Sequence, residues 1–406
     1  MAMNFKRKFL TALVMSTLLG AGAAHASKDN VIRIGVLTDF SGTYADIAGK
    51  GALTAVEMAV EDFSKDRTVN GKKIEVIYAD HLNKADIAAS KAREWYDTQG
   101  VDIIVDLATS SAALAVTAIA EQKNKIALVT TGGALPLTND KCTPVTLHWV
   151  YDTYSLTAGT AKTVVDSGKK SWYFITADYV LGHSLEQEAA KVVKANDGEV
   201  KGAARHPFPG SDFSSYLMTA QSSKADVIAL ANAGSDLANT IKQANEFGIT
   251  TSKQTVLPLL MFISDVHAMG LKTTQGLTLT EAFYWNRDEK TRAWARRFYQ
   301  RAGKMPTSAQ AGDYSGVTNY LKAVKATGTT DTATVMKYLK STPIDDGLFK
   351  GQIRADGRLA HDMLLVQVKS PAESKEPWDY YKIKSVIPAD VATMPLSQSQ
   401  CKLVKK

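Results

Sequence analysis

Residues 101–133 decide the fold class of this chain, and they read VDIIVDLATSSAALAVTAIAEQKNKIALVTTGG. Two short apolar runs, Val101–Leu107 and Ile126–Thr130, flank Ala112–Lys123, whose periodicity predicts a helix. Such a strand–helix–strand unit is typical of a parallel sheet that is covered by helices on both faces.

Hydroxyl and glycine residues follow each of these two predicted strands. Thr109, Ser110 and Ser111 come after the first, and the TTGG sequence at 130–133 ends the second. Because parallel strands end at the same edge of a sheet, we expect these O–H and N–H groups to form one cradle. Such a cradle suits a small carboxylate. A local role stays open, since hydroxyls also cap helices and make turn bonds.

The same alternation of strands and helices extends to both sides of this unit. The first series comprises strands at 31–38, 73–79, 101–107 and 126–130 and helices at 51–63, 86–99 and 112–123. The second series comprises helices at 155–167, 185–196, 213–221 and 236–247 and strands at 172–176, 199–204, 227–231 and 255–260. Two α/β halves in succession predict two doubly wound, Rossmann-like lobes with a cleft between their strand ends. Asp236 begins its predicted helix and is expected to cap it.

The last third of the chain has a less repetitive pattern. It predicts that the chain passes back to lobe 1 and then again to lobe 2. We expect crossovers near 149–153, 272–278 and 343–347, which together make a hinge that permits closure around a ligand. The predicted boundaries are 1–26 for a signal peptide, 27–149 with 276–344 for lobe 1, 150–275 with 345–386 for lobe 2, and 387–406 for a C-terminal tail that returns to lobe 1.

The N-terminus has the composition of a secretory signal. Lys6, Arg7 and Lys8 precede the apolar run Phe9–Leu19, which is too short to span a bilayer, and Ala24-His25-Ala26 fits an A-x-A cleavage site. We therefore expect cleavage near Ala26 and export to the periplasm, with a membrane anchor as the alternative.

Charge and cysteine content narrow the class further. The formal net charge is +7, and without the three signal-peptide cations it is 7 − 3 = +4, which is too mild to indicate nucleic-acid binding. Arginines between 292 and 301 have the spacing of a solvated helix face. In an exported chain, Cys142 and Cys401 are expected to form a disulfide. They are too few for a zinc site.

Catalytic motifs are missing from the sequence. Gly42 and Gly49-Lys50 resemble a P-loop only superficially, because six residues rather than four separate the glycines and Gly51 stands where magnesium needs a hydroxyl. The sequence contains neither a G-x-S-x-G elbow nor an H-E-x-x-H motif. We therefore expect no enzyme, no metal and no cofactor.

Several segments together carry a family likeness. They are Ile32–Gly35 with Ser41-Gly42, the Gly49–Glu57 helix, Thr109–Ser111, Thr130–Pro136, Asp178–Gly182 and Gly210–Ser214. In this order and spacing the chain resembles the periplasmic ligand-binding proteins of ABC transporters, specifically the leucine/isoleucine/valine-binding type. The resemblance covers essentially the whole mature chain. It implies a type I periplasmic binding fold, which is α/β with two doubly wound Rossmann-like lobes joined by a three-crossover hinge.

The resemblance also implies where a carboxylate binds. Thr109 and Ser110 would hold it through hydroxyls, with backbone help at Gly132 and Ala134. Position 134 departs from the family, which commonly has threonine there, so Thr131 or Ser111 would compensate.

The second lobe departs further. Amino-acid binders of the family hold the ammonium with two tyrosines and a glutamate, where this chain has Leu181, about Ala233, and Leu260 or Met261. A buried cation without a partner costs several kcal/mol. We therefore expect a carboxylate without an α-ammonium. The aromatic residues nearby and the resemblance to aromatic-acid-binding members of the family imply an aromatic acid of the benzoate, phenylacetate or hydroxycinnamate type. A branched-chain or other amino acid is the alternative, and an amide or urea-like compound is the third.

The predicted site draws on both lobes. Tyr44 and Ile47 would cover the ring, while Asp178 and Tyr179 would reach a ring hydroxyl. The aromatic run from Phe283 to Trp285 also fits ordinary hinge packing. The candidate ligand-binding residues are Tyr44, Ile47, Thr109, Ser110, Ser111, Thr131, Gly132, Gly133, Asp178, Tyr179, Leu181, Met261, Phe262, Phe283 and Tyr284. By the same resemblance the closed form would dock transiently on membrane permease subunits, and we expect a monomer.

Overall fold

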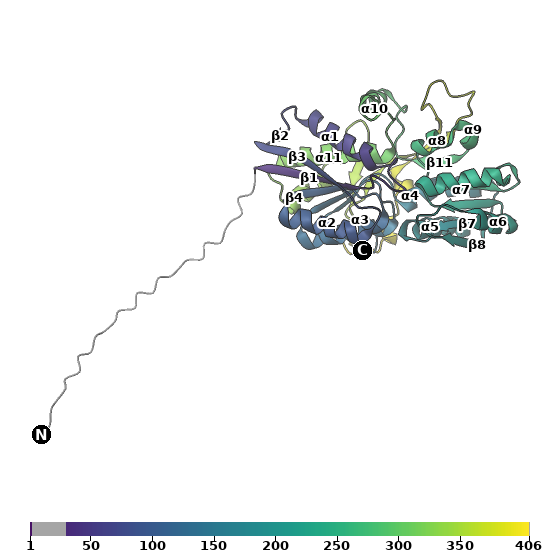
Figure 1. The fold of residues 1–406 in the computed structure, drawn as a ribbon, viewed down its shortest axis with the longest axis horizontal. Helices are drawn as coiled ribbons and strands as arrows, with labels where there is room; N and C mark the ends of the chain where they lie inside the picture. Colours follow the sequence, from purple (N-terminus) through teal and green to yellow (C-terminus); the bar gives the residue numbers. More distant parts are fainter. Residues whose placement is uncertain (2–29, 406) are drawn as a thin grey trace.

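The computed structural model describes Met1 and residues 30–405, and it shows two α/β lobes side by side (Figure 1). The predicted signal peptide and its cleavage position near Ala26 lie outside the described residues. Within the described part of the chain, no helix is long and apolar enough to cross a membrane.

Lobe 1 is built on a six-stranded sheet with the order β2-β3-β1-β4-β5-β6, parallel except for the short β2–β3 pair. Its central strands are apolar runs buried on both faces, as the sequence predicts. The elements are β1 (Val31–Thr38), α1 (Gly49–Phe63), β2 (Thr68–Val69), β3 (Lys72–Asp80), α2 (Ala85–Thr98), β4 (Val101–Asp106), α3 (Ser110–Lys123), β5 (Ile126–Val129), the single turn η1 (Leu135–Thr138) and β6 (Thr146–His148). Helix α11 (Ser308–Thr327) returns to this lobe and packs on α1.

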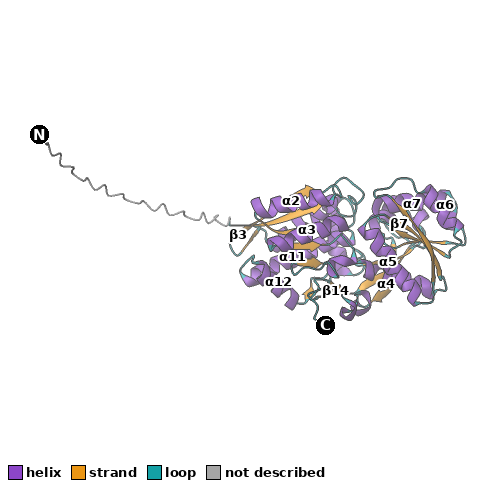
Figure 2. Ribbon diagram, turned by 90° about the horizontal axis from the view of Figure 1, so that it is seen from below, coloured by secondary structure: helices purple, strands orange, loops and turns teal. Residues whose placement is uncertain are grey.

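Lobe 2 has a four-stranded parallel sheet with the order β10-β9-β7-β8, and helices lie around it (Figure 2). The elements are α4 (Thr153–Asp166), β7 (Ser171–Ala177), α5 (Val180–Ala195), β8 (Glu199–His206), α6 (Ser214–Ser222), β9 (Val227–Ala231), α7 (Gly234–Glu246), η2 (Ile249–Thr251), β10 (Thr255–Pro258), α8 (Ile263–Met269) and α9 (Leu271–Thr274). Both sheets are doubly wound, so the predicted fold class is confirmed.

Two small antiparallel sheets, β11-β15-β16 and β12-β13-β14, complete the fold where the chain returns between the lobes. The remaining elements are β11 (Thr278–Glu281), α10 (Glu289–Ala302), α12 (Thr332–Ser341), β12 (Ile344–Asp345), β13 (Lys350–Ile353), β14 (Leu359–His361), β15 (Met363–Val368), β16 (Tyr381–Ile387), α13 (Ala389–Ala392) and η3 (Leu396–Gln398).

A buried arginine just before β14 fixes the first crossover between the lobes. Arg358 is 1% exposed, and its Nε lies 3.1 Å from an Asp152 carboxylate oxygen. Its terminal nitrogens donate to the carbonyls of His148, Trp149 and Val150 at 3.2–3.3 Å. A planar guanidinium with several donors matches this ring of acceptors. The guanidinium of Arg358 therefore holds residues 148–152, the first crossover between the lobes, in place.

The predicted disulfide is present. Cys142 and Cys401 are bonded, with their Cα atoms 5.6 Å apart, across 259 residues of sequence. The backbone N–H of Gln400 also donates to the side chain of Asn139 at 2.6 Å. The tail thus ends against lobe 1, beside α3 in Figure 1.

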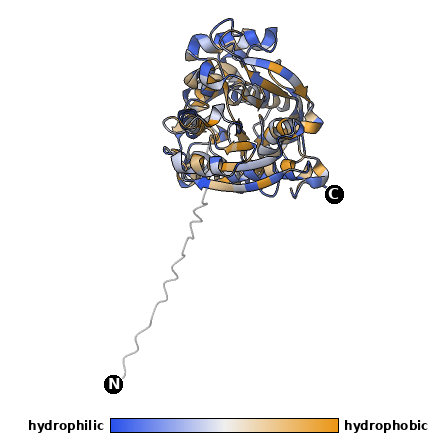
Figure 3. Cartoon of the chain, turned by 90° about the vertical axis from the view of Figure 1, so that its right-hand side faces the viewer, coloured by the Kyte–Doolittle hydropathy of each residue, from blue (hydrophilic) through white to orange (hydrophobic). Residues whose placement is uncertain are grey.

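The arginine-bearing helix α10 is amphipathic, like the banded outer helices in Figure 3. It buries Trp294 and Phe298 and turns its charged residues outward. Arg301 pairs with Glu61 at 2.6 Å, and Arg297 pairs with Asp62. These acids neutralise the basic face, so the prediction of a solvated helix face is confirmed.

Candidate ligand-binding cleft

The first turn of α3 forms the centre of the predicted cradle. Thr109 is the N-cap residue with extended backbone, yet its side chain makes no capping hydrogen bond. The residue is 1% exposed, and among the described residues its hydroxyl has no hydrogen-bond partner. The first N–H groups of a helix also lack intrahelical acceptors, and this turn contains no acid. The geometry therefore leaves a buried group of donors that suits an anion.

Gly132 allows the second turn to pack against α3. A Cβ atom there would stand 2.9 Å from the carbonyl oxygen of Leu107 and 3.0 Å from the Cβ of Ala113. The hydroxyl of Ser110 in turn accepts from the backbone N–H of Ala134 at 3.2 Å. The two predicted turns therefore meet. The departure at position 134 leaves the backbone contact intact, because that contact needs no side chain.

Thr131 has a different partner from the one the sequence suggested. Its hydroxyl donates to the carboxyl of Asp106, while the neighbouring Thr130 donates to Asp313 at 2.6 Å. Burial raises the pKa of Asp106 to about 6 and raises that of Asp313 well above its usual range. The two carboxyls therefore hold a proton near neutral pH. The hydroxyl of Thr131 supports this buried pair, and its carbonyl accepts from Tyr151 at 2.5 Å.

The two lobes touch through aromatic side chains. The hydroxyl of Tyr44 in lobe 1 is hydrogen-bonded to that of Tyr179 in lobe 2. The ring of Phe208 stacks on Tyr179 at 4.1 Å and on Tyr44 at 5.7 Å between centroids. The backbone N–H of Ser235 donates to the carbonyl of Thr43 at 3.3 Å. These contacts describe a closed arrangement of the lobes. Sequence reasoning missed Phe208, which stands in an irregular, proline-flanked loop without periodicity.

A second group of aromatic side chains borders the cradle. Tyr151 lies against Gly133, where an added Cβ would be 2.7 Å from its ring and 3.5 Å from Leu181 of lobe 2. Phe262 meets Tyr151 edge-on at 5.7 Å between centroids. Ile47 and Met261 are each 1% exposed. The structure thus brings Leu181 and Phe262 to the cradle through Tyr151, a residue absent from the predicted set.

Other predicted residues have partners elsewhere. The side chain of Asp178 is 57% exposed and lies 2.7 Å from the His183 ring. Phe283 meets Trp294 of α10 at 5.7 Å between centroids, and Tyr284 donates to Asp379 at 3.2 Å. Phe283 and Tyr284 therefore have the hinge-packing contacts that the sequence left open. Ser111 lies in the first turn of α3 and is half-buried.

Sequence reasoning did not identify two buried acids, Asp265 and Glu281. An oxygen of Asp265 accepts from the backbone N–H of Phe262 at 2.8 Å, and Glu281 accepts from the hydroxyl of Tyr381 at 3.3 Å. Burial raises the pKa of Asp265 to about 7 and that of Glu281 to about 8. Glu281 is therefore neutral at pH 7. Asp265 was missed because it stands four or five residues beyond the position the family likeness indicates.

The predicted capping role of Asp236 is wrong. Helix α7 begins at Gly234 with Ala233 as its N-cap, so Asp236 stands within the first turn. One carboxylate oxygen accepts from the backbone N–H of Gly210 at 3.0 Å. The helix starts earlier than its apolar periodicity indicates. It begins at Gly234, which adopts a positive φ of 62° that glycine tolerates.

A cavity of about 460 Å³ opens at the lobe boundary. Phe40, Asp46 and Lys50 line it from lobe 1, and Ser264 of α8 lines it from lobe 2. Within the described chain the hydroxyl of Ser264 has no hydrogen-bond partner. Residues of both lobes therefore line this cavity.

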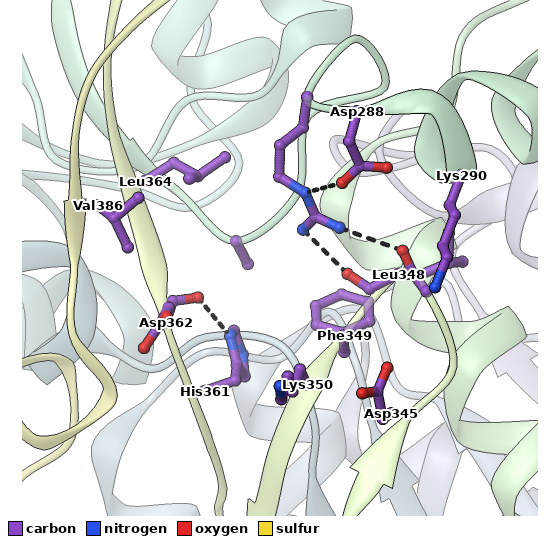
Figure 4. Close-up of a pocket in the computed structure, with 13 residues that line it drawn as sticks. Asp288, Lys290, Asp345, Leu348, Phe349, Lys350, His361, Asp362, Leu364 and Val386 are labelled. Carbon is purple, nitrogen blue, oxygen red and sulfur yellow. Dashed lines mark hydrogen bonds and ion pairs between the residues drawn. The ribbon is translucent and has the colours of Figure 1, made fainter.

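A separate pocket of about 310 Å³ lies on the hinge sheets (Figure 4). Arg287 dominates it, pairing with Asp288 at 2.7 Å and donating to the carbonyls of Gly347 and Leu348 at 3.1 Å. Because its guanidinium already has these partners, the hinge pocket does not offer the unsatisfied donors that the cradle has.

Comparisons with known proteins agree with this architecture. A family model described as periplasmic binding protein matches residues 31–375. The chain is similar to a periplasmic binding protein of Burkholderia mallei, with 54% identity, a TM-score of 0.91, and coverage of 93% of this chain and 100% of that one. It is 27% identical to a Leu/Ile/Val-binding protein homologue of Brucella melitensis over 80% of this chain and 82% of the relative.

A more distant solved structure shares the fold. The solute-binding protein of an ABC transporter from Rhodopseudomonas palustris, in complex with 3,4-dihydroxybenzoic acid, is 20% identical, with a TM-score of 0.80 and coverage of 89% of this chain and 98% of that one. Proteins of this family bind solutes in the periplasm rather than catalyse reactions, so the prediction that the chain is not an enzyme is confirmed. The chain belongs to the periplasmic binding protein family, as a substrate-binding protein of ABC transporters of the leucine/isoleucine/valine-binding type.

Proposed function

We propose that this protein binds a small aromatic carboxylate, of the benzoate, phenylacetate or hydroxycinnamate type, between its lobes. The observation that carries the proposal is the buried hydroxyl of Thr109, which has no partner among the described residues, at the N-terminus of α3. A buried hydroxyl without a partner costs about 1–3 kcal/mol. A ligand carboxylate would satisfy it together with the first N–H groups of the helix.

The surroundings of the cradle support an aromatic ring on the carboxylate. Tyr44, Tyr179 and Phe208 form a stack where the lobes meet, and Tyr151 and Phe262 pack edge-on beside Gly133. Aromatic side chains prefer stacked or edge-on arrangements with other rings. The distant R. palustris neighbour binds such an acid in the same fold, although that likeness concerns the fold alone.

An amino acid is the second candidate, and the buried acids favour it. Asp265 and Glu281 are carboxyls that a ligand ammonium could pair with, and Brucella relatives are named for leucine, isoleucine and valine. Burial raises the pKa of Glu281 to about 8, and an ammonium beside it would offset that effect and hold the group ionised. A thermal-shift comparison of leucine with benzoate and cinnamate separates the two candidates.

The transport cycle that we propose follows from two lobes and a hinge. Lobe 1 takes the carboxylate in the open state, and closure brings Tyr179, Leu181 and Phe262 of lobe 2 over the ring. The closed form then docks on permease subunits of the membrane. A periplasmic location follows from family membership. We also propose that the signal peptide is cleaved, that the lobes have the predicted boundaries, and that the protein is a monomer.

The cradle is tested by removing its hydroxyls. The double variant Thr109→Val, Ser110→Ala should bind every aromatic acid with about 10- to 100-fold lower affinity, because hydrogen bonds to charged groups contribute about 1.5–3 kcal/mol. Thr219→Val on the exposed face of α6 is the matched control, and its affinity should equal that of the wild type. Isothermal titration calorimetry measures both. Unchanged affinity in the double variant would remove the cradle from the proposal.

A further inference from the structure

Asp236 carries an unexplained carboxylate oxygen at the lobe boundary. The residue is 0% exposed, and one oxygen accepts from the backbone N–H of Gly210 at 3.0 Å. Within the described residues its other oxygen, Oδ1, has no hydrogen-bond partner. Buried acceptors are almost always satisfied, so a fully buried orphan calls for a specific explanation.

The protein itself does not supply the missing donor. Among the described residues, no lysine or arginine forms an ion pair with Asp236. The titratable ring of His206 lies beside it, with Nδ1 3.9 Å from the other carboxylate oxygen. That nitrogen is 2.8 Å from the carbonyl of Pro207, which takes its hydrogen, and burial lowers the pKa of His206 so that the ring stays neutral.

Asp236 also lies at the closed face between the lobes. The first turn of α7 presses on lobe 1, because a Cβ at Gly234 would be 2.4 Å from the carbonyl of Thr43 and 3.0 Å from the Tyr44 ring. Burial chiefly raises the pKa of Tyr44 and of Tyr179, and the negative charge of Asp236 raises both further. The first turn of α7, which carries Asp236, therefore lies against the loop of lobe 1 that carries Tyr44.

We infer that Oδ1 of Asp236 accepts a hydrogen bond from a hydroxyl on the bound aromatic acid, so that the substrate class is a hydroxylated aromatic acid. The inference rests on the proposed function, since it places the ring between the cradle and α7. One orphaned oxygen matches one donor. A hydroxyl supplies one, whereas an ammonium carries three N–H donors, two of which would need acceptors other than this oxygen.

Matched pairs of ligands test this inference on the wild-type protein. Calorimetry should show 3- or 4-hydroxybenzoate binding about 10- to 100-fold more tightly than benzoate, since leaving a buried acceptor unsatisfied costs about 1–3 kcal/mol. Phenylacetate and cinnamate should show the same preference for their hydroxylated forms. Equal affinities within every pair would overturn the inference and leave the carboxylate site standing. Failure of every acid to bind would overturn the proposed function as well.

Variants locate the discrimination at Asp236. In Asp236→Ala the preference for the hydroxylated acid should fall to about 1, while benzoate affinity stays within about 2-fold of the wild type. Asp236→Asn has a single side-chain oxygen; when that oxygen accepts from the N–H of Gly210, the amide NH2 stands at the Oδ1 position, so the preference should fall there as well. Glu246→Ala, an exposed acid on the same helix, is the control.

A merely structural role of Asp236 would weaken both members of a pair equally, and that result would overturn the inference. A preserved preference in Asp236→Ala would do the same. Tighter binding of 4-(aminomethyl)benzoate than of 4-hydroxybenzoate would assign a cationic donor instead. If Asp236→Ala does not fold, the wild-type ligand pairs and Asp236→Asn still decide the outcome.

Discussion

Replacing Arg358 by methionine should strongly destabilise the hinge. The side chain is 1% exposed, pairs with Asp152 at 3.1 Å and donates to three carbonyls of residues 148–150. Methionine fills much of the volume but leaves a buried carboxylate and those acceptors without their cation. Breaking a buried ion pair from one side costs about 3–5 kcal/mol. Urea denaturation followed by tryptophan fluorescence should show a loss of this size.

A double-mutant cycle isolates the pair from the packing. Asp152→Asn keeps the cap that Asp152 gives to Ser155 of α4 at 2.7 Å but removes the charge. The loss from Arg358→Met should be smaller by about 2 kcal/mol in that background, because no buried charge is left unpaired. The double cycle should therefore be clearly non-additive. Additive losses, or a loss below about 1 kcal/mol in the single variant, would refute the reasoning.

Three further predictions concern stability and its dependence on conditions. Serine at both Cys142 and Cys401 should lower the free energy of unfolding by up to about 5 kcal/mol, since the bond closes a loop across 259 residues; urea curves indistinguishable from wild type would contradict this. Glu281→Gln should raise the Tm at pH 8 but not near pH 4.5. The pKa of Glu281 is raised to about 8 in the fold, so wild-type stability falls between its ordinary pKa and pH 8; a pH-independent difference would disprove it. Gly132→Ala should cost about 1–3 kcal/mol and weaken carboxylate binding, because its Cβ meets the Leu107 carbonyl; calorimetry and melting curves equal to wild type would exclude that clash.

The architecture was predictable because it depends on periodic patterns. Short apolar runs such as Val101–Leu107 and Ile126–Thr130, in alternation with helical patterns, are typical of central parallel strands, and the hydroxyls after them meet at one sheet edge. The disulfide followed from two cysteines in an exported chain. These inferences use local composition and topology, which the sequence carries directly.

The opposite wall of the cleft was harder to predict. Phe208 lies in a loop whose conformation no periodicity specifies, and Tyr151 reaches the cradle only because the crossover folds back under Gly133. Asp236 and Glu281 look like ordinary helix-start and strand-end acids, and only tertiary burial distinguishes them. Contacts between distant segments depend on how the lobes close. The spacing of residues along the sequence does not show which of them meet in the closed cleft.

The most direct test of the central claim is a crystal structure of the protein with a bound aromatic acid. The account predicts a ligand carboxylate oxygen within about 3 Å of the hydroxyl of Thr109 and of the first N–H groups of α3, with the ring enclosed between Tyr44 and the lobe 2 aromatics. A ligand that places an uncharged group against Thr109, or that binds away from the α3 N-terminus, would contradict it.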